Sequence, residues 1–286
     1  MTDSIFNPHF NINPEIEDDL RDIERRRWLI DHMLLMPRHE AWLRREIQVR
    51  RASGTTRIEG ANLDESAVSR LMAQGAGANP TEDEQANLNA LGAYEFIDFL
   101  SDQHDLPTDE LVIREVNRRF IEGTSEMLTP GVYRKGQNMV GKFTPPDQGD
   151  VPALMRSFAL WLREEKEIHP VIKAGIAHIH LVAIHPFWDG NGRTARGLAT
   201  LLLQRSQFGF RKLLSLESQL FNNRDPYFTA IERTLGTRFS LDYDATPWLE
   251  FFTLSLAAEV QRLEDNLTDW HRMMQENYDM AETMGL

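Results

Sequence analysis

Apolar residues at helical spacing run through almost the whole chain of 286 residues, and this pattern limits the fold more than any other feature. From Pro14 to about Arg51 the spacing predicts two helices, divided near Pro37. The pattern therefore predicts an all-α fold in which the N-terminal third packs directly on the rest. Further helices are expected after the N-cap candidates Asp64 and Thr81, from Thr108, around Leu154, from Val171, from Thr194, and from about Pro226 and Thr246.

One segment interrupts the helical pattern. Residues Thr129 to Pro146, TPGVYRKGQNMVGKFTPP, contain three glycines and three prolines. The short apolar runs Val132-Tyr133 and Met139-Val140 suit a small β-hairpin, which is the one β element that the sequence predicts. Taken alone, such a segment is an ordinary surface hairpin.

Composition excludes several classes of function. The net charge of -13 argues against general affinity for nucleic-acid phosphates or anionic membranes. The absence of cysteine excludes disulfides, thiolate metal sites and a cysteine nucleophile. The N-terminus has no signal-peptide pattern, and no apolar run approaches the roughly 18 residues of a membrane span. A cytoplasmic location is the expectation that follows.

Polar residues with chemical uses are concentrated in the segment His185 to Arg196, HPFWDGNGRTAR. It lies between an apolar helix ending at Ile184 and another helix beginning after Gly192. The Gly-Asn-Gly turn exposes backbone N–H groups at the start of that second helix, where the helix dipole also favours a phosphate. The segment is therefore a candidate binding site for the phosphates of a nucleotide.

Four side chains around this turn suit the same ligand. Arg193 and Arg196 fall on neighbouring helical positions and could bracket a polyphosphate. Asp189 offers a hard oxygen ligand for a phosphate-bound Mg²⁺, and His185 titrates near neutral pH, so it could take a proton from an attacking hydroxyl.

Simpler interpretations exist for each of these residues. A Gly-Asn-Gly turn is common, a histidine before proline often ends a helix, and His185 with Asp189 could be a metal pair, although Pro186 and Gly190 disfavour a regular helix between them. His178 and His180, two residues apart on a helix, point to different sides, so packing is the expectation for both. The combination is more specific than its parts.

The whole HPFWDGNGRTAR segment resembles the signature of the Fic (filamentation induced by cAMP) family, without departure at a defining position. The resemblance implies an all-helical core with a β-hairpin flap. It also implies transfer of AMP from ATP to a Ser, Thr or Tyr hydroxyl of a protein, with release of pyrophosphate. Carried over, the roles are general base for His185, Mg²⁺ ligand for Asp189, anion hole for Gly190, Asn191 and Gly192, β-phosphate contact for Arg193 and γ-phosphate contact for Arg196.

The resemblance extends over roughly Pro107 to Glu259. It includes the Gly/Pro-rich segment, which is similar to the family's flap, where the backbone is thought to pair with an extended target segment. Residues 242–252, DYDATPWLEFF, resemble the stretch that helps close the nucleotide site but lack its Asn-Gly. Candidate target contacts on the flap are Val132, Gln137, Met139 and Val140.

A second motif lies upstream, at Thr55-x-x-x-Glu59-Gly60. By itself this motif predicts no more than a capped helical turn ended by glycine. Beside the downstream signature it resembles the inhibitory motif of Fic proteins that carry an N-terminal regulatory helix. Glu59 would then pair with Arg196, occupy the place of the γ-phosphate and suppress transfer. In some relatives this glutamate also supports removal of AMP, which is a second hypothesis.

The expected organisation is an N-terminal helical region over 1–105 with the inhibitory helix at about 53–60, a catalytic core over 106–270 and a helical tail over 271–286. Two alternatives to AMP transfer stay open: a phosphotransferase of the Doc type, disfavoured by the intact Gly-Asn-Gly-Arg, and a regulatory module that binds ATP without turnover. The target protein, which could be the chain itself, and a homodimer are also left open.

Overall fold

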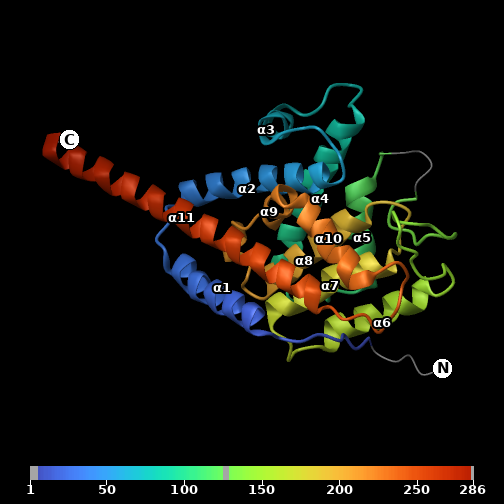
Figure 1. The fold of residues 1–286 in the computed structure, drawn as a ribbon. Helices are drawn as coiled ribbons and strands as arrows, with labels where there is room; N and C mark the ends of the chain where they lie inside the picture. Colours follow the sequence, from blue (N-terminus) through green and yellow to red (C-terminus); the bar gives the residue numbers. More distant parts are fainter. Residues whose placement is uncertain (1–5, 125–128, 285–286) are drawn as a thin grey trace.

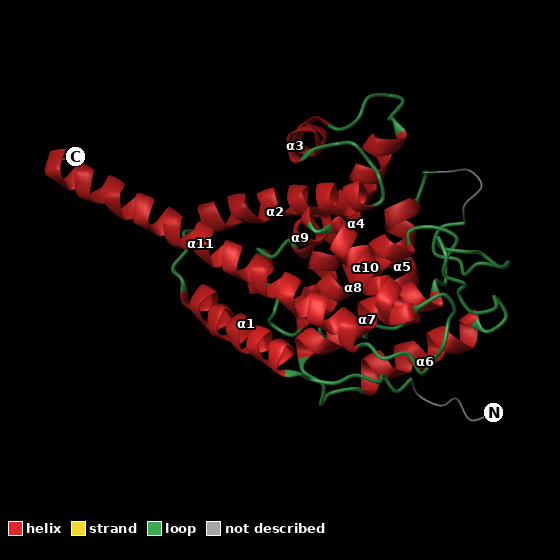
Figure 2. Ribbon diagram, viewed as in Figure 1, coloured by secondary structure: helices red, strands yellow, loops and turns green. Residues whose placement is uncertain are grey.

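The computed structural model describes residues 6–124 and 129–284, and these are almost entirely helical (Figures 1 and 2). The all-α prediction is confirmed. The elements are α1 Pro14–His32, α2 Pro37–Ile58, α3 Glu65–Gln74, α4 Glu82–Asp102, α5 Glu110–Ile121, α6 Val151–Glu164, α7 Pro170–Ile184, α8 Asn191–Arg205, the 3₁₀ turn Phe210–Lys212, α9 Leu216–Asn222, α10 Arg224–Leu235 and α11 Thr246–Met284.

Helix starts follow the capping residues of the sequence. Asp64 caps α3, and Thr81 forms with Glu84 the predicted capping box at the start of α4. At α5 the cap is Asp109 rather than the expected Thr108, because the Asp109 carboxylate accepts the Val112 N–H at 3.0 Å. The segment predicted as an inhibitory helix, 53–60, comprises the last turns of α2 and its C-cap, Glu59.

Two hydrophobic clusters meet at α8. The larger cluster joins α1 and α6 to α7, α8, α10 and α11, and α7 is buried around nearly its whole circumference because almost every one of its residues is apolar. The smaller cluster joins α2, α4 and α5, with Leu201 of α8 among its members. Helix α8 is therefore held by both clusters, which fixes the position of the His185–Gly190 loop before it.

The N-terminal helices pack directly on the rest of the chain, as predicted. In Figure 1, α1 lies along α11, and α2 packs across α9 and α4. The boundaries 1–105, 106–270 and 271–286 stay a prediction. No helix in the two described ranges is long and apolar enough to span a bilayer.

The predicted hairpin is reduced to a single bridged pair. Val140 and Phe143 exchange both backbone hydrogen bonds at 2.9 Å around Gly141, whose φ is +57°. Residues 6–124 and 129–284 contain isolated bridges but no strand, and Pro145 and Pro146, which lack N–H donors, prevent further pairing at this end of the segment. Residues 125–128 lie outside the described part of the chain.

Candidate active site

The loop from His185 to Gly190 joins α7 to α8 through two residues in the left-handed region. His185 ends α7 with φ +49° while its N–H reaches the Leu181 carbonyl at 2.9 Å. Gly190, with φ +75°, precedes α8, and a Cβ there would lie 2.6 Å from Ile121 Cγ2. Glycine is therefore required at 190 by both conformation and space.

Asn191 closes this loop on itself. Its Oδ1 accepts the Phe187 N–H and its Nδ2 donates to the Phe187 carbonyl, both at 2.9 Å, and the side chain is buried. The resemblance placed Asn191 in the anion hole. In the structure its side chain holds the loop, which leaves its backbone N–H for a ligand.

The first turn of α8 presents backbone N–H groups that have no partner within the helix. The first helical hydrogen bond in this turn joins Thr194 N to the Gly190 carbonyl at 2.8 Å. The N–H groups of Asn191, Gly192 and Arg193 precede that bond and have no carbonyl within the helix to reach. These donors and the positive end of the helix dipole favour a phosphate at this position.

The environment of His185 keeps its imidazole neutral. Burial lowers its pKa to about 4, and the Arg134 guanidinium acts in the same direction, while the nearby carboxylates of Glu59 and Asp189 oppose the shift. A histidine with this pKa has one unprotonated ring nitrogen at neutral pH and can accept a proton there from a hydroxyl.

Asp189 is half exposed and faces the same end of α8. Its Oδ1 accepts the Gly190 N–H at 2.6 Å, and its Oδ2 pairs with Arg193 Nη2 at 2.9 Å. A single carboxylate together with substrate phosphates and waters is the usual environment of Mg²⁺ in nucleotide enzymes, so Asp189 fits the metal that the resemblance implies. The described residues contain no cluster of three or more acidic or histidine ligands.

Arg196 is buried, and four of its five N–H groups have partners. Nε donates to Thr55 Oγ1 at 2.9 Å, Nη2 donates to the Thr55 carbonyl at 3.1 Å and to Glu59 Oε1 at 2.6 Å, and Nη1 donates to the Tyr227 hydroxyl at 3.3 Å. Burial alone would lower the pKa of Arg196, but Tyr227 and Glu59 outweigh burial and raise it. The predicted pairing of Glu59 with Arg196 is present, and Thr55 belongs to the same contact.

Three residues of this site escaped the sequence analysis, and the first is Tyr227 of α10. Its hydroxyl also contacts His178 Nε2 at 3.1 Å, and the His178 ring stacks on Trp248 at 4.5 Å between centroids. His178 and His180 are both buried, as the packing interpretation predicted. The network joins Arg196 to α7, α10 and α11. No local motif marks Tyr227, because its partners are far away in the sequence.

Asn117 of α5 connects the flap to the loop from His185 to Gly190. Its Nδ2 donates to the Asp189 carbonyl at 3.0 Å and lies 3.1 Å from Thr194 Oγ1, and its Oδ1 accepts the Gly131 N–H at 3.0 Å. Asn117 is fully buried, and a buried amide must find such partners, but its burial follows from how α5 packs and no local motif marks it.

Arg134 attaches the flap to His185. Its Nε donates to the His185 carbonyl at 2.9 Å and its Nη1 to the Gly136 carbonyl at 3.0 Å, while Nη2 donates to the Pro146 carbonyl. The Arg134 backbone N–H also reaches the Pro186 carbonyl at 2.9 Å. The sequence analysis did not single out Arg134, because its burial within the Gly/Pro-rich segment becomes visible only in the structure.

The four predicted flap contacts lie in this segment without touching His185 directly. Met139 is 69% exposed and Val140 is 39% exposed, whereas Val132 is partly buried. Gln137 Nε2 crosses the turn to the Pro145 carbonyl at 2.9 Å. Their role in target binding stays a prediction.

A cavity of about 390 Å³ lies beside the last turn of α7. Its walls are largely apolar and come from the flap, α7 and α10, with Phe143, Val182 and Phe228 among them. Val182 stands one turn before His185, so the cavity adjoins the His185 loop.

Comparison with known proteins agrees with this geometry. The Fic/DOC family model matches residues 107–203. A protein adenylyltransferase Fic from Drosophila virilis is 44% identical over 98 residues, which is 34% of this chain and 20% of that protein. This chain thus spans about a fifth of the length of the curated relatives that it matches.

Solved structures extend the likeness across most of the fold. A Fic family protein from Desulfovibrio desulfuricans G20 has a TM-score of 0.77 at 24% identity, covering 91% of this chain and 77% of that one. Fic-1 from C. elegans, residues 134–508, has a TM-score of 0.73 at 23% identity, covering 92% and 73%. Residues 107–203, with the His185 loop and the start of α8, therefore form a domain of the Fic/DOC family.

Proposed function

We propose that this chain transfers AMP from ATP to a hydroxyl group of a protein and that Glu59 restrains the reaction. The observation that carries the proposal is the juxtaposition of a neutral His185 with the free N–H groups of α8 and the buried Arg196. The Fic/DOC family model matches the segment 107–203 that holds these groups, and the relatives named protein adenylyltransferase Fic support the same reaction.

The transfer is a single displacement at phosphorus. The hydroxyl oxygen of the target attacks the α-phosphorus of ATP while His185 accepts the hydroxyl proton. The bond from the α-phosphorus to the oxygen that bridges to the β-phosphate breaks, and pyrophosphate leaves with that oxygen. The products are a protein phosphodiester, pyrophosphate and a protonated His185, which returns its proton to solvent.

Positioning and charge compensation come from the start of α8. The N–H groups of Asn191, Gly192 and Arg193 bind phosphate oxygens, and Arg193 and Arg196 add permanent positive charge. Asp189 would hold Mg²⁺, which neutralises charge on the phosphates when it is bound. Asn117 and Arg134 keep the loop in shape, since both bind backbone carbonyls of residues 185–189.

The restraint follows from the contact between Glu59 and Arg196. While Glu59 Oε1 sits 2.6 Å from Arg196 Nη2, that N–H is not available to a phosphate. Glu59 Oε1 also lies near Gly192, where a Cβ would meet it at 2.6 Å. A carboxylate in this place repels the terminal phosphate and shifts ATP away from the alignment needed for attack.

We assign binding of the ATP base to the cavity on one side of the flap and binding of the target protein to the exposed side. The cavity of about 390 Å³ is apolar enough for a purine base and adjoins the last turn of α7. Next to the bridged Val140, the exposed Met139 offers an edge against which an extended target segment could pair.

The test is to follow each phosphate of ATP separately. The Glu59→Gly variant, with Mg²⁺ and a cell lysate, is incubated with ATP labelled on either the α- or the γ-phosphate, and protein-bound label is measured. AMP transfer predicts protein labelling from the α-label alone. Labelling from the γ-label would instead indicate a phosphotransferase, and ATP-dependent thermal stabilisation without any label would indicate a binding module.

A further inference from the structure

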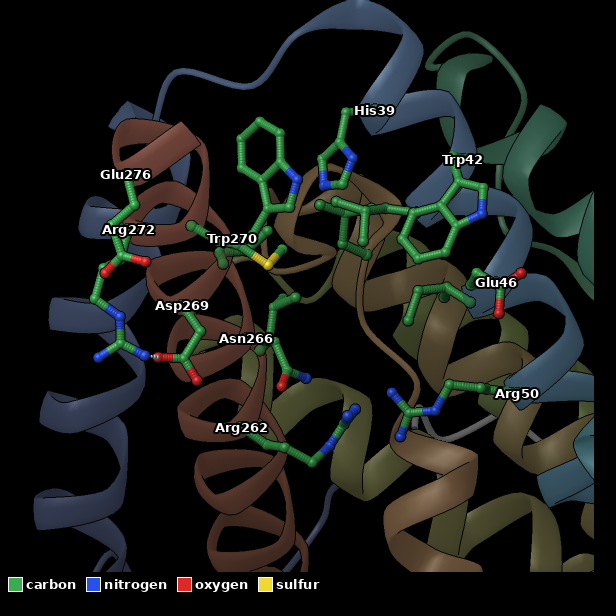
Figure 3. Close-up of a pocket in the computed structure, with 16 residues that line it drawn as sticks. His39, Trp42, Glu46, Arg50, Arg262, Asn266, Asp269, Trp270, Arg272 and Glu276 are labelled. Atoms are coloured by element: carbon green, nitrogen blue, oxygen red, sulfur yellow. Dashed lines mark hydrogen bonds and ion pairs between the residues drawn. The ribbon is translucent and has the colours of Figure 1, made fainter. Parts of the chain in front are cut away.

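A second cavity, of about 610 Å³, lies between α2 and α11, away from the His185 loop (Figure 3). Its size falls within the range typical of small-molecule sites. Residues at helical spacing on one face of each helix form its walls: His39, Trp42, Glu46 and Arg50 from α2, and Arg262, Asn266, Trp270 and Met273 from α11. The AMP-transfer reaction proposed above uses none of them.

One end of the cavity is aromatic. The His39 ring stacks on Trp270 with centroids 3.8 Å apart and an angle of 12°, and Trp42 lies 5.5 Å from the same histidine. Trp42 is 54% exposed, although tryptophan side chains are highly buried on average. The shielded Nε2 atom of His39 has no hydrogen-bond partner. These three rings offer flat surfaces for stacking.

The other end is cationic. Figure 3 shows Arg50 and Arg262 extending from opposite helices toward the same point, with Asn266 beside them. Arg262 is bound to the buried carboxylate of Glu259, with Nε 2.8 Å from Oε2. Arg50 lies 3.7 Å from Glu65 Oε1, longer than a normal hydrogen bond, and the carboxylate that acts on it most strongly is the same buried Glu259.

The mostly buried Arg50 thus shares the Glu259 carboxylate with Arg262, which leaves one positive charge in excess at the floor of an apolar cavity. Such a charge is costly unless an anion compensates it. Around it, Leu213, Leu263 and Leu267 provide apolar wall. Acidic residues are present at the margins, where Asp269 is paired with Arg272 at 2.9 Å and Glu46 lies on the α2 wall.

We propose that this cavity binds a small molecule with a flat aromatic ring and one anionic group. The ring lies against Trp42, Trp270 and His39, and the anion meets Arg50, with Asn266 as a further donor. The same helix, α2, carries Thr55 and Glu59 at its C-terminal end, so the ligand would contact the helix that restrains Arg196.

Two dyes of the same shape test this assignment on the full chain. Anilinonaphthalene sulfonate carries an aromatic system and one anion, and phenylnaphthylamine carries the aromatic system without the charge. We expect one saturable site per chain for the sulfonate, with about tenfold weaker binding of the neutral dye, the ratio expected from one charge-assisted hydrogen bond. Fluorescence titration measures both affinities.

Variants separate the two ends of the cavity. Arg50→Gln should weaken the sulfonate about tenfold and leave the neutral dye unchanged, and the exposed Asn266→Asp, which places a negative charge beside Arg50, should act in the same direction. Trp42→Ala should weaken both dyes. Arg163→Gln, at an exposed arginine of α6 paired with its neighbour Glu164, should change neither.

Equal affinity of the two dyes, or an unchanged sulfonate affinity in both Arg50→Gln and Asn266→Asp, would overturn the proposal. So would a chain that dimerises in sedimentation and binds dye only as a monomer, because the cavity would then receive a second copy. All readouts are binding measurements, so they stand even if the chain transfers no AMP.

Discussion

Removing the Glu59 carboxylate is the perturbation with the most direct structural consequence. Glu59 holds Arg196 by one charge-assisted hydrogen bond of 2.6 Å, and its side chain is 41% exposed. A hydrogen bond to a charged group contributes about 1.5–3 kcal/mol, and the exposure of Glu59 places this one toward the lower end of that range. The lower end of that range is about 1.5–2 kcal/mol, and about 1.4 kcal/mol corresponds to a factor of ten, so Glu59→Gly should raise the rate of AMP transfer about 10- to 30-fold.

The same variant should keep the wild-type fold with only a small loss of stability. Arg196 keeps Thr55 Oγ1, the Thr55 carbonyl and the Tyr227 hydroxyl as acceptors, so it is not left unpaired. We expect the free energy of unfolding to fall by no more than about 2 kcal/mol, which is the contribution of the lost hydrogen bond. Urea unfolding measures this value, and it separates a released restraint from a damaged fold.

The assay is the initial rate of AMP incorporation at saturating ATP. Glu59→Ala serves as a second test, because it removes the carboxylate without adding a glycine. Glu164→Ala, which breaks an exposed pair with Arg163, is the matched control and should leave the rate unchanged. A wild type that labels as fast as both Glu59 variants would refute the restraint.

Three further perturbations test the parts of the site. Because burial lowers the pKa of His185 to about 4, its base form persists as pH falls through 6.5, so the Glu59→Gly rate should decline only toward pH 4; a midpoint near 6.5 would contradict this. Asn117→Ala leaves the Gly131 N–H and the Asp189 carbonyl without their partner and should lower kcat at least about tenfold. A Cβ at Gly54 would lie 2.8 Å from the backbone of Glu217, so Gly54→Ala should displace α2, cost about 1–3 kcal/mol in urea unfolding and raise the transfer rate.

The parts of the site that the sequence predicted are those whose residues are contiguous. His185, Asp189 and the Gly-Asn-Gly turn lie within one loop, so their meeting at the start of α8 follows from the chain itself. The contact of Arg196 with Thr55 and Glu59 spans 141 and 137 positions, and only the resemblance of two separate motifs anticipated it.

Residues whose partners are distant in the sequence are not marked by any local sequence pattern. Tyr227 and Asn117 stand alone on amphipathic helices, and their partners are set by how α5, α8 and α10 pack. The predicted hairpin shrank to one bridged pair because the prolines that suggested a turn also remove ladder donors. The aromatic and cationic cavity likewise arises only when α2 meets α11.

The central claim is that the His185 loop transfers AMP and that Glu59 restrains it. Intact-mass spectrometry of wild type, Glu59→Gly and Glu59→Gly with His185→Ala, each incubated with ATP, Mg²⁺ and lysate, tests both halves in one measurement. The account predicts AMP adducts on protein with Glu59→Gly, few with wild type and none with the double variant. Adducts that persist without His185, or their absence from all three despite ATP binding, would contradict it.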